Sequence, residues 1–301
     1  VEAHEDLEND LNGNSRVLAG ISTVDPINSP TGGPISNPTD PQAHGMAIAG
    51  IIGASHNTKG VSGIAPTVQI LPIHISLTLT AVSEIADAIN YSWKNGADVI
   101  NNAWASDFCT VDDNFFPPVL NAIDSAHTFG RNGKGCIVVY AAGVIDASNT
   151  DVCVRYPASI EDVITVSAMD AFGDIPAYSP YGPEVDVAAV SSPSTLSNVS
   201  ALDRMGNNGY NTDTTMSMDY PDRDYTRWFG GTSTASAQVS GIAALVLSVD
   251  STLTYIEVAQ YIKNNATPMA NDLLGWYGAG RANAFGAVNE VMTSFPVEWA
   301  Y

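Results

Sequence analysis

Short apolar runs recur along the chain, and each is continuous rather than alternating with polar residues. A strand that reads in this way is typically buried on both faces of a sheet. The pattern predicts five such strands, at residues 68–75, 98–104, 136–142, 163–169 and 185–190.

Helical patterns fill the stretches between these runs and most of the carboxyl-terminal part. The pattern over residues 117–135 has Pro at its start and Gly at its end, as helices often do. The helix expected after Ser233 is apolar nearly all round, which predicts a central and buried position. The other predicted helices cover residues 44–54, 82–96, 255–266 and 282–292.

Strands that alternate with helices predict an α/β fold, with a mostly parallel central sheet and helices on both of its faces. Residues 191–228 are rich in Ser, Asn and Asp and predict a loop region. We expect one domain with three α/β/α layers over residues 1–301. Its functional side chains should lie at the carboxyl ends of the strands.

Composition narrows the class of protein. The chain has 301 residues, of which 45% are apolar, so it can bury a large core. Asp and Glu outnumber Lys and Arg by 32 to 11, which gives a formal net charge of −21. Nucleic-acid binding requires clusters of Lys and Arg, and no stretch reaches the roughly 18 apolar residues of a membrane helix. We therefore expect a soluble monomer that binds neither nucleic acid nor membrane.

The three cysteines, Cys109, Cys136 and Cys153, match no zinc-binding spacing. Cys109 and Cys153 follow two strands that we expect to be neighbours, so both thiols should lie in loops at the carboxyl edge of the sheet. A secreted setting would let them oxidise to a disulfide. Cys136 belongs to a predicted buried strand and is expected to remain a buried thiol.

Several segments carry candidate chemistry. Residues 230–248 read GGTSTASAQVSGIAALVLS and put hydroxyl residues at the start of a long apolar helix. Taken alone, such a residue is usually a helix cap that satisfies a free backbone N–H group. The other segments are HGMAIAGII at 44–52, GADVINNAW at 96–104, CIVVYAAGV at 136–144 and GWYGAGRANAFGAVN at 275–289.

In this order the segments resemble the sequence blocks of subtilisin-like serine proteases, or subtilases, over essentially the whole chain. The resemblance implies a subtilisin-like fold, with Ser233 as nucleophile and His44 as the general base that takes its proton. His44 precedes Ser233, which suits this family and not the esterases. The resemblance also implies a peptide-binding surface made of Asn102, Ala103, Trp104, Ala105, Ala141, Ala142 and Gly143.

A serine triad also needs a carboxylate that orients the histidine. The opening VEAHEDL resembles the sequence that directly follows the Asp-bearing strand of subtilases. We therefore expect the triad Asp to lie upstream of Val1, so that this chain lacks it together with its N-terminal strand. Asp25 is the nearest carboxylate before His44, but its flanking residues do not fit the family pattern.

The most informative departure from the family is Val144. Subtilases have Asn at this position, and its side chain donates a hydrogen bond to the oxyanion of the transition state, which valine cannot do. Four more departures lie near the candidate site, where the family has Thr, Ser, Gly and Pro. They are Met46, Ala103, Ala105 and Ala237. Together these changes predict weakened or altered catalysis.

Two functions are consistent with the sequence. The first is a secreted endopeptidase that hydrolyses peptide bonds through an acyl-enzyme on Ser233. The alternative is a catalytically impaired homologue that acts as a peptide-binding or structural module. A nucleotide-binding protein is disfavoured because no glycine-rich loop follows a strand at the required spacing. We expect structural roles for the other histidines, His4, His56, His74 and His127.

We expect a peptide or protein substrate and no catalytic cofactor. Residues 212–224 offer oxygen ligands of the kind that calcium takes, and subtilases often carry structural calcium; the alternative is a solvated acidic loop. The carboxylates in this stretch are Asp213, Asp219, Asp222 and Asp224. A second acidic group would favour a basic substrate side chain, unless it is part of a uniformly acidic surface. It consists of Asp107, Asp112, Asp113, Asp146 and Asp151.

Overall fold

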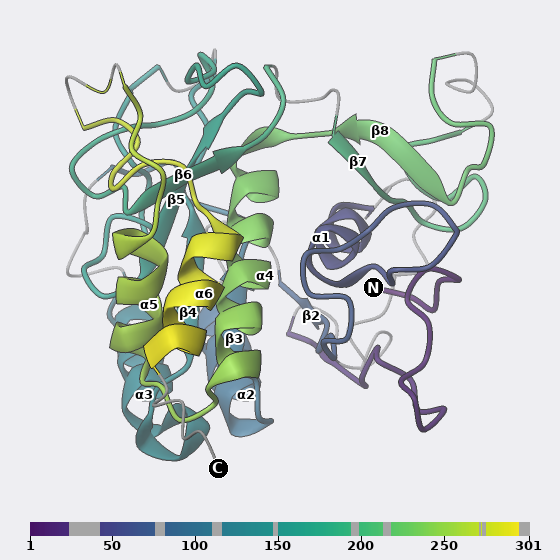
Figure 1. The fold of residues 1–301 in the computed structure, drawn as a ribbon, viewed down its shortest axis with the longest axis horizontal. Helices are drawn as coiled ribbons and strands as arrows, with labels where there is room; N and C mark the ends of the chain where they lie inside the picture. The colour runs from purple at the N-terminus through teal and green to yellow at the C-terminus, as the bar shows by residue number, and fades with distance from the viewer. Residues whose placement is uncertain are drawn as a thin grey trace, which may run out of the picture.

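Four parallel strands form the central sheet of the computed structural model (Figure 1). In sheet order they are β3 (Val99–Asn102), β4 (Ile137–Ala141), β5 (Ile164–Met169) and β6 (Val187–Val190). The structure describes residues 1–23, 43–75, 82–109, 116–146, 150–193, 199–212, 218–270, 272 and 275–294.

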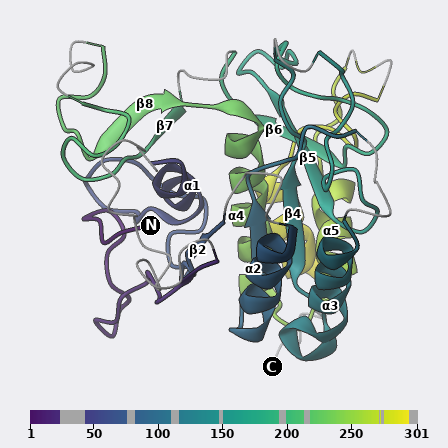
Figure 2. The same ribbon diagram turned by 180° about the vertical axis from the view of Figure 1, so that it is seen from behind.

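Alternate residues of these strands enter two separate cores, because successive side chains of a strand point to opposite faces. Ile137 and Val139 of β4 pack against the face covered by α4, α5 and α6, while Val138 and Tyr140 pack against α2 and α3. Figures 1 and 2 show these two helical layers from opposite sides. The sheet is thus buried on both faces, as its continuous apolar runs predict.

The helices have clear local causes. α5 (Tyr255–Asn264) begins with a capping box, in which the side chains of Thr254 and Glu257 bond each other's backbone N–H groups. α3 (Pro117–Gly133) starts at two prolines, and its regular part ends before Gly130, where the backbone leaves helical angles. The remaining helices around the sheet are α2 (Val82–Lys94), α4 (Gly231–Val249) and α6 (Ala284–Ser294).

A second group of elements lies beside the sheet. It contains α1 (His44–Gly53), the parallel pair β1 (Ile21–Ser22) and β2 (Ile73–His74), and the antiparallel pair β7 (Val199–Leu202) and β8 (Tyr225–Phe229). α1 packs on β7 through two small cores, and α4 contacts α1 from the side of the main sheet. α4 is therefore the element that both groups share.

The predicted α/β architecture is present, with two corrections to its elements. The run at 68–75 forms a regular strand only at Ile73–His74. The preceding residue, Pro72, has no backbone N–H group to donate to a neighbouring strand. The predicted loop at 191–228 contains β7 and most of β8. β7 does not match the pattern of a buried strand, because it is short and has the exposed Ser200 beside buried residues, so it lacks a continuous apolar run.

α4 is long and apolar enough to cross a membrane by length and composition, a criterion that we did not expect any segment to meet. Most of its residues are buried within the protein, against all four strands of the main sheet. Its apolar character is therefore accounted for by a central position in the core, as predicted for the helix after Ser233.

The first testable prediction concerns the packing of α1 on β7. A Cβ atom at Gly50 would lie 2.5 Å from Cγ and 3.0 Å from the backbone nitrogen of Leu202. We expect Gly50→Ala to lower the free energy of unfolding by about 1–3 kcal/mol through overpacking, although alanine favours the helix. Denaturant unfolding measures this change.

Gly45 in the same helix provides the matched control. A Cβ atom there would meet only Cγ2 of Val1, at 3.9 Å. We expect Gly45→Ala to be neutral or slightly stabilising. Equal effects of the two substitutions would contradict the assigned packing.

Candidate active site

Ser233 lies in the first turn of α4, but it is not the helix cap. The cap residue is Gly230, which makes no side-chain capping bond. The half-buried Ser233 instead donates its hydroxyl proton to the backbone oxygen of Ala103, at 3.1 Å. The positive end of the α4 dipole and its free backbone N–H groups surround this hydroxyl, as would suit a nucleophile that develops negative charge beside it.

A buried hydrogen bond joins this turn to the end of β4. The Thr232 hydroxyl donates to the backbone oxygen of Gly143 at 2.7 Å, so Ser233 and Val144 flank the two ends of this bond. Val144 is 39% exposed. Its exposed side chain carries no hydrogen-bond donor. Gly143 has φ +102°, which favours glycine there.

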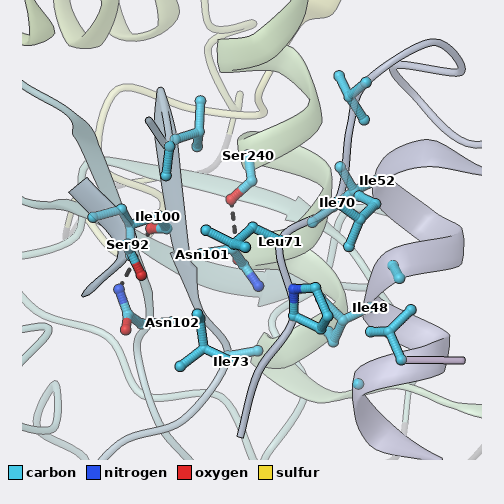
Figure 3. A pocket seen from close by; sticks show the side chains of 18 of the residues that line it. Ile48, Ile52, Ile70, Leu71, Ile73, Ser92, Ile100, Asn101, Asn102 and Ser240 are labelled. Atoms are coloured by element: carbon cyan, nitrogen blue, oxygen red, sulfur yellow. Dashed lines mark hydrogen bonds between the residues drawn. The ribbon is translucent and has the colours of Figure 1, made fainter. Parts of the chain in front are cut away.

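His44 is the first residue of α1 and lines a large cavity between β2 and β3 (Figure 3). His44 is an exposed residue, and its ring makes an edge contact with Phe229, with 5.4 Å between the ring centroids. The protein around the ring lowers the pKa of His44 to about 4 by desolvation. Among the described residues, no hydrogen bond or ion pair joins His44 to a carboxylate or to Ser233.

The carboxylates considered for His44 are not all among the described residues. Asp25 lies outside them, and the triad Asp that the family resemblance implies is expected upstream of Val1. Asp6 is fully buried and accepts bonds from Asn57 and the backbone N–H of Val61. The ring of His4 bonds the backbone N–H of Asp6 and the backbone oxygen of Asp224. His4 and Asp6 of the HEDL segment therefore stabilise the local structure.

The two predicted peptide-binding segments lie side by side, at the carboxyl ends of the paired strands β3 and β4. Their side chains differ in access. Ala103, Trp104 and Ala105 are half-buried, whereas Asn102, Ala141 and Ala142 are buried. A peptide could therefore contact the second group mainly through the neighbouring backbone.

Two of these side chains hold the local structure together. Trp104 packs edge-on against Tyr140 and donates its indole N–H to Asn102 at 3.2 Å. Two residues that depart from the family pattern, Met46 and Ala237, are also buried, at 1% and 0% exposure. Any effect of these two residues on a substrate would therefore be indirect and would act through packing.

Arg155 is a residue of this site that the sequence analysis missed. It is 1% exposed, and its stem lies against Gly143, where an added Cβ would come within 2.2 Å of Arg155 Cγ. Its guanidinium donates to the backbone oxygen of Asp151 at 2.8 Å. The signal was available, because Arg155 is one of only 11 cations in the chain and directly follows a predicted strand-edge loop.

The buried charge of Arg155 changes the electrostatics expected near the predicted peptide-binding segments. Asp107, Asp146 and Asp151 are exposed there, while Asp112 and Asp113 lie outside the described residues. Exposed carboxylates are screened by solvent, whereas a buried guanidinium is screened much less. The described charges therefore do not by themselves favour a basic substrate side chain.

The cysteines have the arrangement that was predicted for them. Cys109 and Cys153 form a disulfide with 5.7 Å between their Cα atoms. Cys136 is a buried free thiol that donates to the backbone oxygen of Ala97, and burial raises its pKa to about 12. The disulfide holds the loops after β3 and before β5 together beside Arg155.

The acidic stretch at 212–224 does not supply a calcium site from its described residues. Asp219 accepts bonds from the backbone of Tyr220 and Arg227 and from the Thr226 hydroxyl. Asp222 and Asp224 accept backbone bonds, and Asp213 lies outside the described residues. In the part of the chain that the structure describes, no three His, Cys, Asp or Glu side chains cluster as metal ligands would.

Known proteins with similar sequences are proteases. The chain is 34% identical to a calcium-dependent protease from Nostoc sp., over 93% of this chain and 44% of that protein. It is 31% identical to subtilisin DY from Bacillus licheniformis, over 81% of this chain and 77% of that protein. The chain thus spans less than half the length of its relative from Nostoc sp.

Solved structures show the same fold. The serine protease of Aeromonas sobria superimposes with a TM-score of 0.76 at 19% identity, over 94% of this chain and 58% of that chain. Fervidolysin from Fervidobacterium pennivorans gives a TM-score of 0.66 at 21% identity, over 91% of this chain and 39% of that chain. At these identities the likeness concerns the fold alone.

A sequence model of the subtilase family matches residues 2–286, which is nearly the whole chain. The match includes His44 at the start of α1, Val144 after β4 and Ser233 in the first turn of α4. With its three-layer fold, its chain order of histidine before serine and its two protease relatives, this chain belongs to the subtilase family.

Proposed function

We propose that this chain is the catalytic part of a serine endopeptidase that hydrolyses peptide bonds through an acyl-enzyme on Ser233. The observation that carries the proposal is the placement of Ser233 in the first turn of the buried helix α4, half-buried and bonded only weakly to Ala103. The protease relatives support the same reaction class. Peptides and proteins are the corresponding substrates.

The reaction requires Ser233 to exchange its bond with Ala103 for one with His44. His44 would take the hydroxyl proton as Ser233 attacks the substrate carbonyl, and would then return it to the leaving amine. Its lowered pKa keeps the ring neutral at pH 7 and able to accept a proton. A carboxylate beside the ring would be needed to stabilise the imidazolium that forms.

Stabilisation of the oxyanion is weaker in this chain than in a subtilase with Asn at position 144. The backbone N–H groups at the start of α4 would contribute, because they point out of the helix end beside Ser233. Val144 contributes no donor. We therefore expect slow turnover rather than none.

The alternative function is that of a catalytically impaired homologue that binds peptides or serves a structural role. Val144 favours it, because this residue stands at the family's oxyanion position and its side chain has no donor for an oxyanion. The two functions differ in whether substitution of Val144 restores turnover.

We also infer that the protein is secreted and works as a monomer outside the cell. The disulfide between Cys109 and Cys153 supports secretion, since such bonds persist in oxidising surroundings and are rare in the cytosol. The net charge of −21 favours a monomer that repels other copies and avoids nucleic acid and membranes.

Val144→Asn tests the proposed reaction. The new amide would bond the oxyanion mainly in the transition state, so we expect turnover to rise by ten-fold or more with little change in KM. The upper limit comes from subtilisin, a member of the same family, where loss of this donor lowers turnover by about 100 to 1000-fold. Hydrolysis of a fluorogenic peptide at high protein concentration measures the change.

Ser233→Ala in both backgrounds provides the blank for this assay. A serine-directed fluorophosphonate should label the parent chain and not the Ser233→Ala variant. Turnover that equals the blank with and without Val144→Asn would contradict the protease function and favour the binding module.

The environment of His44 yields a prediction about pH. Desolvation lowers its pKa from 6.5 to about 4 in the folded chain, so between these values the unfolded chain binds a proton that the folded chain does not. The free energy of unfolding should therefore fall as the pH falls from about 6.5 to 4, and less steeply in His44→Gln. NMR titration of labelled histidine gives the midpoint, and a value at or above 6.5 would contradict this environment.

A further prediction concerns calcium, which the name of the relative from Nostoc sp. raises for this chain. We infer that any structural calcium is bound away from Asp222 and Asp224, because both already accept backbone hydrogen bonds. A chelator should therefore shift the melting temperature equally in the parent chain and in the double variant Asp222→Asn, Asp224→Asn. A shift that disappears only in the variant would place calcium at this loop.

A further inference from the structure

Two neighbouring residues lie between the predicted peptide-binding segments. The pairing of β3 with β4 stops at the end of β3. Beyond that point the backbone N–H of Arg155 donates to the oxygen of Ala142 at 2.9 Å, and the oxygen of Tyr156 accepts a bond from the backbone N–H of Ser106 at 2.8 Å. Arg155 and Tyr156 therefore bond the chain that follows β4 on one side and the chain that follows β3 on the other.

The first turn of α4 is tied to the same two chains. Ser233 bonds the backbone oxygen of Ala103, and Thr232 bonds that of Gly143. In the proposed reaction, the attacked carbonyl carbon has to come within roughly 3–3.5 Å of the Ser233 hydroxyl. The substrate residue that carries this carbonyl, which we call the acyl residue, is therefore placed between the ends of the two segments.

The side chains of an extended peptide point alternately to its two faces. For a peptide held between the two segments, one face is turned to solvent and the other to the protein, where Arg155 lies. A side chain of the acyl residue that points inward enters the space between Gly143 and Ala105. The room in this space sets the size of the side chain that the site accepts.

The stem of Arg155 fills this space. A Cβ atom added at Gly143 would lie 2.2 Å from Cγ of Arg155, 2.7 Å from its Cβ and 3.4 Å from Cβ of Ala105. Arg155 is 1% exposed, and it is the largest of the described side chains that are so fully buried. Its aliphatic stem thus occupies the position that a large substrate side chain would need.

The far end of the side chain holds the stem in place. The guanidinium of Arg155 donates to the backbone oxygen of Asp151 at 2.8 Å. It also lies 3.3 Å and 3.6 Å from the sulfur atoms of Cys109 and Cys153. A stem that moved aside would break these contacts, and a buried donor that loses its partner is costly. Arg155 is therefore a fixed part of the site.

We propose that Arg155 determines the specificity of the site, by restricting the acyl residue to a small side chain such as that of Gly, Ala or Ser. The effect on hydrolysis rests on the proposed function, whereas the effect on binding depends only on the space beside Gly143. A single methylene group changes specificity by about 10–200-fold in a close-fitting pocket. A large aromatic side chain should thus be rejected by ten-fold or more.

The size of the substrate side chain matters more here than its charge. An acidic side chain would gain strongly from Arg155 only through a direct bond to the guanidinium. The guanidinium already bonds the backbone oxygens of Asp107 and Asp151, and the atoms of Arg155 nearest Gly143 are the aliphatic Cβ and Cγ. An inward side chain therefore meets the stem first.

The test compares three substrates that differ only in the acyl residue. They are aminocoumarin amides of Gly-Ala-Val-X, with Ala, Phe or Glu as X, so that release of the coumarin reports cleavage after X. The parent chain should give a kcat/KM at least ten-fold higher for the Ala substrate than for the other two. An equal or higher value for Phe would overturn the proposal, and a highest value for Glu would assign the selectivity to charge instead.

Arg155→Met and Arg155→Ala form a matched pair of variants. Both remove the guanidinium and its hydrogen bonds, but methionine keeps an unbranched stem, whereas alanine empties the space beside Gly143. We expect Arg155→Met to retain the preference for the Ala substrate. In Arg155→Ala the ratio of the Ala to the Phe substrate should fall at least ten-fold. Thermal melting checks that both variants fold, and equal ratios in the two folded variants would overturn the proposal.

Binding separates this proposal from the proposed function. Fluorescein-labelled Gly-Ala-Val-X peptides with a free carboxyl end resemble the acyl product and bind without reaction. In the Ser233→Ala chain, fluorescence anisotropy should show at least ten-fold tighter binding for Ala than for Phe, and Arg155→Ala in the same chain should abolish this difference.

The two measurements have distinct outcomes. Selective binding without any turnover that depends on Ser233 would support the role of Arg155 and contradict the protease function. Turnover that depends on Ser233 but shows no preference among the substrates would overturn the role of Arg155 alone. The absence of both binding and turnover would contradict both proposals.

Discussion

The burial of α4 is the constraint on which the rest of the structure depends. Its apolar surface packs against all four strands of the main sheet, against α5 and α6, and against α1 of the neighbouring group. Among the helices that the structure describes, none of the others contacts both groups so extensively. The start of α4 is therefore fixed in space, and with it Ser233 and the bond from Thr232 to Gly143 that aligns Val144. The hydroxyl is positioned by the core and not by a loop.

The residues of the candidate site are held in place by different parts of the fold. Ser233, Gly143 and Ala103 belong to the main sheet and its central helix, where layers on both faces hold them. His44 comes from α1, where desolvation by the surrounding protein lowers the pKa of its ring. The nucleophile is thus positioned by the packing of the main sheet and its central helix, whereas the candidate base belongs to the neighbouring group of elements.

Charge is distributed unevenly around this site. The surface is strongly acidic, yet the cation Arg155 is buried beside Gly143, where it bonds backbone oxygens and lies against the disulfide. Burial strengthens electrostatic effects that solvent weakens at exposed carboxylates. The net charge of the protein therefore says little about the charge that a substrate meets here.

The sequence by itself determined the layers, the family blocks and the identities of His44, Val144 and Ser233, because continuous apolar runs and short motifs are local properties of the chain. It also located Cys109 and Cys153 at one edge of the sheet, since both follow strands that pair. Only the tertiary structure decided that Ser233 bonds Ala103 and that Arg155 is buried against Gly143. These depend on contacts between residues far apart in the chain, which local patterns do not encode.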